Sequence, residues 1–176
     1  SQAQARSLFP LSGAAWQRQL TMGNSKRRDV PRFETPLIET HCHLDYLDAD
    51  ALAATLAQSA TAGIERIITI AVSPANLAKV LELTREAANI WGTQGVHPHE
   101  ANTYNDAVEA LVRAQAADDR ILAIGEIGLD YHYDHADRTV QRTVFERQLQ
   151  LAADLAMPVV IHTRDADADT RDILRA

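Results

Sequence analysis

Short apolar segments that alternate with longer amphipathic segments constrain the fold of this chain more than any other feature. Five such segments, each too short for a helix and rich in Ile and Val, begin at Leu37: Leu37–His41, Arg66–Val72, Ile90–Val96, Ile121–Gly125 and Val159–Ile161. Buried parallel strands typically have this length and composition. The pattern therefore predicts five parallel strands.

The segments between these strands have the apolar spacing of amphipathic helices. The positions that carry this spacing include Leu52 and Leu56, Leu77 and Leu81, Val108 and Val112, and Phe145 and Leu149. Gly63 follows the first helix, Ser73 and Pro74 would be the cap and first residue of the second, and Pro158 would stop another before its strand. A strand followed by a helix, repeated in this way, predicts a parallel α/β fold.

The same pattern favours a TIM-type barrel over an open doubly wound sheet. No glycine-rich phosphate loop of the dinucleotide or Walker type follows any predicted strand. A complete barrel has eight β/α units and usually takes about 250 residues, whereas this chain has 176. We therefore expect only about the first five β/α units of eight, with the sequence ending inside a helix at Ala176.

The first 36 residues differ in charge from the rest of the chain. They contain six Lys/Arg and two Asp/Glu, whereas the whole chain has a formal charge of −7, which leaves −11 for residues 37–176. We predict a disordered extension over residues 1–36 and the N-terminal part of the barrel over residues 37–176. Translation from Met22 is one interpretation of this extension, and a transit peptide is the competing one.

Composition also limits the class of protein. No run approaches the roughly 18 apolar residues of a membrane-spanning helix, and the single Cys42 cannot form an internal disulfide, so we expect a cytoplasmic protein without a membrane partner. Nothing in the sequence indicates an obligate protein partner. The acidic body lacks the basic footprint of a sequence-reading nucleic-acid domain, so metal ions would have to hold a polyanionic substrate.

Candidate chemistry begins at the stretch IETHCHLD, which contains His41 and His43. Side chains alternate along a strand, so these two imidazoles lie on one face and are able to bind one divalent ion at a strand end. The alternative is a chance His-x-His pair.

Two further strand ends carry polar residues of the same kind. Glu126 follows the apolar run of ILAIGEIGLDY, and His162 follows that of PVVIHTRDADAD. A solvated loop carboxylate and a core histidine are the alternatives for each residue alone. Together with His41 and His43, they form a set of three imidazoles and one carboxylate that suits zinc, manganese or magnesium.

Four motifs in this order, IETHCHLD, GVHPHE, GEIGLDY and PVVIHTRDADAD, resemble the TatD family of metal-dependent deoxyribonucleases, which are amidohydrolase-like TIM barrels. The resemblance implies two divalent ions: His41 and His43 would hold the first, His162 the second, and Glu126 would bridge both as the central catalytic residue. Magnesium is the metal that the family suggests, although three imidazoles match zinc or manganese better by ligand softness.

The resemblance also implies a substrate side. His97 and His99 would lie beside the substrate, either contacting phosphate or stabilising their loop. Arg164 would present its planar guanidinium to a phosphate, and an ion pair with Asp165 or Asp167 is the alternative. His132 and His135 have no counterpart in the family pattern, and we expect them to be surface residues.

Two departures from the family pattern qualify this interpretation. Glu39 stands where the family usually has Asp, which preserves the charge and the face. The family's histidine from the sixth strand and aspartate from the eighth have no counterpart before Ala176.

The expected function is hydrolysis of phosphodiester bonds in DNA, from 3′ to 5′ on single strands. The sequence leaves open whether these 176 residues are active by themselves. The alternatives are an amide or ester hydrolase, such as an aminoacyl-tRNA deacylase, and a truncated product without catalytic activity.

Overall fold

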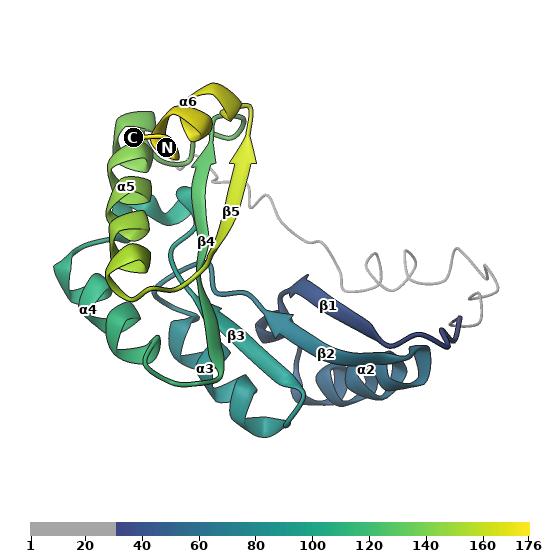
Figure 1. The fold of residues 1–176 in the computed structure, drawn as a ribbon. Helices are drawn as coiled ribbons and strands as arrows, with labels where there is room; N and C mark the ends of the chain where they lie inside the picture. Colours follow the sequence, from purple (N-terminus) through teal and green to yellow (C-terminus); the bar gives the residue numbers. More distant parts are fainter. Residues whose placement is uncertain (1–30) are drawn as a thin grey trace, which may run out of the picture. The chain divides into compact units, whose positions relative to one another are not determined.

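The computed structural model describes residues 31–176, which are built on a parallel sheet of five strands (Figure 1). The strands are β1 (Leu37–Cys42), β2 (Ile64–Thr69), β3 (Ile90–Gln94), β4 (Ile121–Asp130) and β5 (Val159–Arg164). Hydrogen bonds join them in the order β1-β2-β3-β4-β5, so each strand pairs with its neighbours in sequence. The predicted number of strands and their parallel direction are confirmed.

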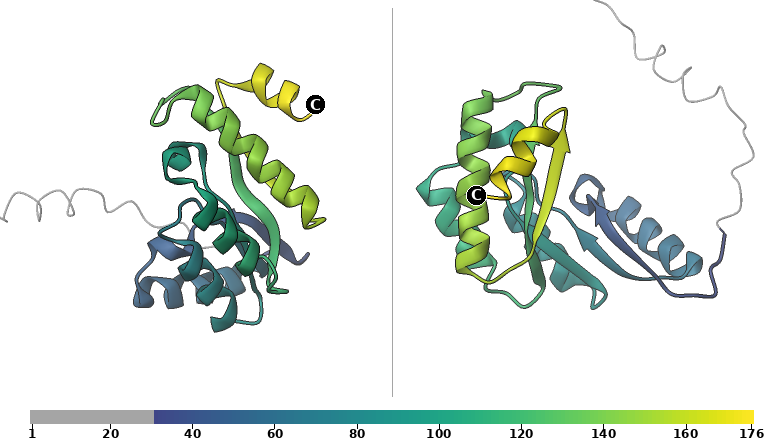
Figure 2. Two further views of the ribbon diagram at one scale, coloured as in Figure 1. Left: turned by 90° about the vertical axis from the view of Figure 1, so that its left-hand side faces the viewer. Right: turned by 45° about the horizontal axis from the view of Figure 1, so that its top comes forward.

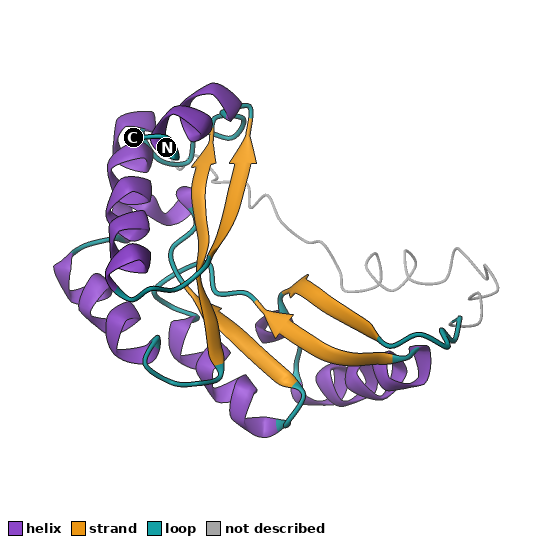
Figure 3. Ribbon diagram, in the orientation of Figure 1, coloured by secondary structure: helices purple, strands orange, loops and turns teal. Residues whose placement is uncertain are grey.

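Helices connect the strands and cover the convex side of the curled sheet (Figures 2 and 3). The elements are the α-helices α2 (Ala49–Ala62), α3 (Leu77–Glu86), α4 (Asp106–Gln115), α5 (Arg138–Asp154) and α6 (Asp167–Ile173), and the 3-10 helices η1 (Leu44–Tyr46) and η2 (Pro98–Thr103). This curled sheet with alternating helices is a half-barrel, which confirms the predicted partial TIM-type fold.

A buried apolar cluster holds β4 against the helices. Phe145 of α5 and Leu77 and Val80 of α3 pack with Ile124 and Ile127 of β4, and all five side chains are 0% exposed. Burying one large apolar side chain contributes roughly 1.5–3 kcal/mol. The strand that carries Glu126 is therefore fixed by the core.

The helix ends agree with the prediction at one place and differ at another. Gly63 ends α2 with a φ of 95°, a left-handed conformation that glycine adopts without a steric cost. The predicted start of α3 at Ser73 and Pro74 is wrong, because this helix begins at Leu77 with Asn76 as its N-cap. The Asn76 carboxamide oxygen accepts the Ser73 N–H at 3.0 Å, so Ser73 belongs to a turn that precedes the helix.

Strands β4 and β5 are longer than predicted. The prediction ended them at Gly125 and Ile161, but they continue to Asp130 and Arg164. Glu126 and His162 thus lie within strands and not directly after them. An apolar run stops at the first polar side chain, whereas a strand continues where that side chain finds hydrogen-bonding partners.

Gly128 lets β4 and β5 approach closely. It pairs with His162 in the ladder, and its φ is 140°. A Cβ atom at this position would overlap the backbone oxygen of His162. Glycine is therefore required where the two strands bring their functional side chains together.

Residues 31–36, the described part of the predicted extension, contain no helix or strand. The Phe33 N–H nevertheless donates to the Ala62 carbonyl at 3.0 Å. The predictions for residues 1–30, Met22 included, lie outside the described residues. Within residues 31–176, the helices lack the length and apolar character needed to cross a membrane.

Candidate active site

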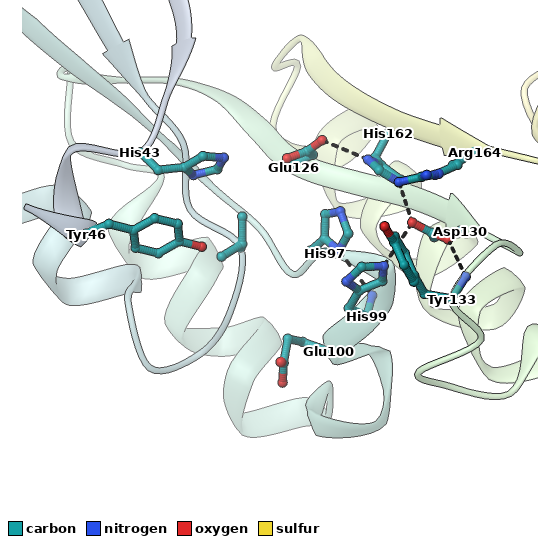
Figure 4. Close-up of a pocket in the computed structure, with 11 residues that line it drawn as sticks. His43, Tyr46, His97, His99, Glu100, Glu126, Asp130, Tyr133, His162 and Arg164 are labelled. Carbon is teal, nitrogen blue, oxygen red and sulfur yellow. Dashed lines mark hydrogen bonds and ion pairs between the residues drawn. The ribbon is translucent and has the colours of Figure 1, made fainter. Parts of the chain in front are cut away.

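A pocket of about 300 Å³ opens where the carboxyl ends of the strands meet, the end at which (β/α) barrels place their active sites (Figure 4). Its walls come from β4, β5 and the loops that follow β1, β2 and β3. The lining residues are His43, Tyr46, Val72, His97, His99, Glu100, Glu126, Asp130, Tyr133, His162 and Arg164.

His41 and His43 come from the end of β1. His43 lies just beyond the strand, and its Nδ1 is 3.2 Å from the Ile70 carbonyl oxygen. Since a carbonyl only accepts, Nδ1 carries the proton and the Nε2 lone pair stays available for a metal. The His41 ring lies edge-on to that of His43, with 5.5 Å between centroids.

Glu126 connects β1 with β5. Its side chain is buried, with Oε2 at 3.4 Å from His41 Nε2 and Oε1 at 3.2 Å from His162 Nδ1. Burial acts to raise the pKa of Glu126, but the His162 hydrogen bond and the nearby imidazoles outweigh it and lower the pKa below its usual value. The carboxylate thus faces a different imidazole with each oxygen.

Asp130 is a candidate site residue that the sequence analysis missed, and it lines the same pocket. Its Oδ2 accepts hydrogen bonds from His162 Nε2 at 3.0 Å and His99 Nε2 at 2.9 Å, and Oδ1 accepts the backbone N–H groups of His132 and Tyr133. Burial acts to raise the pKa of Asp130, but these bonds hold it well below the usual range.

The signal for Asp130 was present in GEIGLDY, because Glu126, Gly128 and Asp130 recur every second residue on one face of β4. An aspartate that accepts a hydrogen bond from one ring N–H of a histidine orients the other ring nitrogen toward a metal. Asp130 is placed to do this for His162, whose Nδ1 points to Glu126.

His97 differs from His43 and His162 in its hydrogen bonding, because one of its ring nitrogens accepts a backbone N–H. Its Nδ1 accepts the His99 backbone N–H at 3.1 Å, and burial lowers its pKa to about 4. The neutral ring therefore carries its proton on Nε2. With Nδ1 accepting and Nε2 protonated, His97 is a hydrogen-bond donor to the pocket and not a metal ligand in this arrangement.

Two groups of side chains have the spacing of metal ligands. His41, His43 and Glu126 form one, and His97, Glu126 and His162 form the other, with the ligand atoms of each group within 4.8 Å of one another. Glu126 belongs to both. Nitrogen and carboxylate donors around one shared carboxylate fit a pair of divalent ions, although the Nδ1 bond of His97 sets that residue apart within its group.

Arg164 lines the pocket but makes neither of the ion pairs weighed for it. Its guanidinium lies 4.6 Å from the centre of the Tyr133 ring. Asp165 is paired with His132 at 2.9 Å, and Asp167 accepts a hydrogen bond from Thr163.

His132 and His135 are exposed, as predicted. The His135 ring nonetheless lies 4.6 Å from that of His99, at the edge of the site.

The model of a protein family described as TatD related DNase matches residues 38–176. The chain belongs to the TatD family. The match covers all five strands from the second residue of β1 onward, and so includes every residue of the candidate site. The family resemblance noted in the four sequence motifs is confirmed.

A metal-dependent hydrolase and an exonuclease align with a large part of the chain. The metal-dependent hydrolase YabD of Bacillus subtilis is 31% identical over 140 residues, which cover 79% of this chain and 55% of that protein. The 3'-5' ssDNA/RNA exonuclease TatD of Cronobacter sakazakii is 39% identical over 113 residues, covering 64% of this chain and 43% of that protein.

The crystal structure of YJJV, a TatD homologue of Escherichia coli K12, superposes with a TM-score of 0.74 at 29% identity. The match covers 79% of this chain and 55% of that one. The chain thus spans about half the length of each of these three proteins.

Proposed function

We propose that this chain contributes to a two-metal hydrolase that cleaves phosphodiester bonds in single-stranded nucleic acid from the 3′ end. The observation that carries this proposal is the position of Glu126, whose two carboxylate oxygens face imidazoles from β1 and β5. We also propose residues 37–176 as the N-terminal part of the barrel and the cytoplasm as its compartment, the latter because Cys42 is a free thiol.

The four proposed ligands divide between two ions. His41 and His43 would hold the first, His162 would hold the second, and Glu126 would bridge them, in agreement with the two side-chain groups that share Glu126. When bound, such ions supply Lewis-acid activation of water and neutralise charge that develops on the phosphodiester. Asp130 would keep His162 oriented and maintain its Nδ1 edge toward the second ion.

The metal itself is proposed as magnesium, manganese or zinc. Magnesium agrees with the family, whereas three imidazoles among four ligands favour manganese or zinc by ligand softness.

Three further residues are proposed to hold the substrate. The Nε2–H of His97 is available to donate to a phosphate oxygen, because Nδ1 is occupied by the His99 backbone. His99 Nε2 is bonded to Asp130, so His99 would contact phosphate only through a protonated Nδ1. Arg164 lines the same pocket and would add a planar pair of N–H donors.

The TatD protein of Cronobacter sakazakii is a 3'-5' ssDNA/RNA exonuclease, which supports single-stranded DNA and RNA as substrates. We therefore extend the expected substrate from DNA to either type of strand. The same comparison makes the amide or ester hydrolase the weaker alternative.

The test is a titration with Mn²⁺ followed by calorimetry, on the wild type and on Glu126→Gln. The wild type should bind two ions, and the variant should lose tight binding because the shared ligand loses its charge. Cleavage of a 5′-labelled oligonucleotide should fall on the order of 1,000-fold, which corresponds to several kcal/mol of electrostatic stabilisation.

Glu100→Gln is the matched control, because Glu100 lines the same pocket but belongs to neither ligand group. It should bind Mn²⁺ like the wild type. Unchanged Mn²⁺ affinity in Glu126→Gln would reject the bridging role, and an uncleaved oligonucleotide beside a cleaved aminoacyl ester would reject the nuclease.

A further inference from the structure

Two exposed tyrosines line the pocket on opposite sides of His97, Tyr46 beside His43 and Tyr133 beside Arg164 (Figure 4). Tyr46 is 70% exposed and Tyr133 is 51% exposed. A single exposed aromatic ring is ordinary on a protein surface. Two such rings on opposite walls of one polar pocket form a more specific arrangement.

Tyr46 is held by the site itself. Its ring stacks on His43 with 5.2 Å between the centroids and an angle of 19° between the planes. One face is thus supported, while the large exposed fraction leaves ring surface open to a ligand. Because His43 is a proposed metal ligand, a group stacked on Tyr46 would lie next to the first ion.

Tyr133 belongs to a second flat surface on the opposite wall. The Arg164 guanidinium lies 4.6 Å from its ring centre, and the His135 ring is nearly parallel to it, at 23° and 5.8 Å. The Tyr133 backbone N–H donates to Asp130, which also bonds His162. This surface is therefore tied to the second side of the candidate metal centre and carries a positive charge.

We propose that Tyr46 and the Tyr133–Arg164 pair are stacking surfaces that hold the two bases flanking the phosphodiester to be cleaved. This inference rests on the proposed function. Aromatic rings and guanidinium planes recognise unpaired bases by stacking, without preference for sequence. Bases held on opposite walls must be separated from each other, which a base-paired strand does not permit. The two surfaces would thereby select single-stranded ends.

The test combines protein variants that keep Glu126 with altered substrates, and every oligonucleotide carries non-hydrolysable phosphonate linkages at its 3′ end so that it stays intact. Binding of 5′-fluorescein-labelled single strands is measured by anisotropy in Mn²⁺ for three proteins: Tyr46→Ala, Tyr133→Ala and the protein with both tyrosines intact. The strands are either complete or carry one abasic residue, at the 3′-terminal or the penultimate position. Tyr46→Phe and Tyr133→Phe keep the rings, and Phe33→Ala removes a ring that is 48% exposed outside the pocket.

Each alanine variant should weaken binding of the complete strand about tenfold, in line with the energy of one base–aromatic stack. The phenylalanine variants and Phe33→Ala should bind like the unaltered protein. On one of the two abasic strands, each alanine variant should bind as tightly as the protein with both tyrosines intact. The base that the missing ring would contact is absent from that strand.

Equal weakening on complete and abasic strands would overturn the inference and assign the tyrosines a role in supporting His43 and Asp130. Mn²⁺ affinity, measured for the same variants, should stay unchanged if the rings contact only bases. If the protein with both tyrosines intact binds no strand, the proposed function is overturned together with this inference. Normal binding without coupling to the abasic sites would overturn the inference alone.

Discussion

At the end of β1, the His43 ring is oriented by one backbone carbonyl and the His41 side chain is 42% exposed. At the ends of β4 and β5, the His162 ring is held between two carboxylates, those of Glu126 and Asp130. The first half of the candidate metal centre is thus more open, and the second is fixed by partly buried charge-assisted hydrogen bonds. A side chain held by two hydrogen bonds from a neighbouring strand is better pre-organised than one at an exposed strand end.

The close approach of β4 and β5 at Gly128 offers the strongest test of this contrast. In Gly128→Ala, the new Cβ would collide with the His162 backbone, and the φ of 140° would be strained. We expect the free energy of unfolding to fall by about 3 kcal/mol, as measured by urea denaturation. Gly92→Ala meets side chains of α3 instead and should cost less. Equal losses of unfolding free energy in the two variants would show that the contact between β4 and β5 at Gly128 is no more restrictive than ordinary side-chain packing.

The orienting role of Asp130 is the next test. Asp130→Asn keeps the size of the side chain but removes the charge that faces His162 and His99. Mn²⁺ affinity should fall about 10- to 100-fold, as is typical when a residue that orients a metal-binding histidine is lost. The control is Asp134→Asn, since Asp134 is exposed and pairs with Arg138. A wild-type Mn²⁺ affinity in Asp130→Asn would mean that His162 does not need Asp130 to be oriented for metal binding.

A hydrogen bond between Tyr131, which directly follows β4, and Asp169 of α6 gives a prediction for alkaline pH. Burial and a 2.6 Å hydrogen bond to Asp169 raise the pKa of Tyr131 to about 12. Because the pKa in the folded state exceeds that of an ordinary tyrosine, the stabilisation is complete below about pH 10 and is lost as the pH rises toward 12. Tyr131→Phe should therefore be less stable than the wild type by about 1 kcal/mol at pH 8.

This stability difference should shrink as urea denaturation is repeated at pH 10 and 11. Asp169→Asn should reduce the pH dependence, because it removes the charged acceptor, but should not abolish it, because Tyr131 stays partly buried. A difference that stays constant from pH 8 to pH 11 would contradict the raised pKa.

The smallest effect is expected at Glu39, the carboxylate of the β1 side. Its carboxylate accepts the His41 backbone N–H at 2.9 Å, and this exposed hydrogen bond involves the backbone and not the imidazole ring. Glu39→Gln keeps an acceptor oxygen, so Mn²⁺ affinity should change by less than about twofold. A tenfold loss would instead show that the β1 imidazoles also depend on a nearby carboxylate, and the contrast between the two sides would disappear.

Much of this organisation follows from local patterns in the chain. Apolar periodicity was sufficient for five parallel strands and the intervening helices, because period and composition depend on residues that are neighbours in sequence. The motifs were also sufficient to select His41, His43, Glu126 and His162, which the structure places in two side-chain groups that share Glu126. Their roles as ligands remain proposals.

Only the tertiary structure decided how the polar residues pair. Asp130 reaches His162 because β4 and β5 pair in one register, and Gly128 makes that register possible. The proton position on His97 depends on the loop backbone at His99, and β4 continues beyond Gly125 because it pairs with β5 as far as Asp130. Sequence determined which groups are available, whereas long-range hydrogen bonding decided how His162 is oriented, because its partners Glu126 and Asp130 lie more than thirty residues away in the chain.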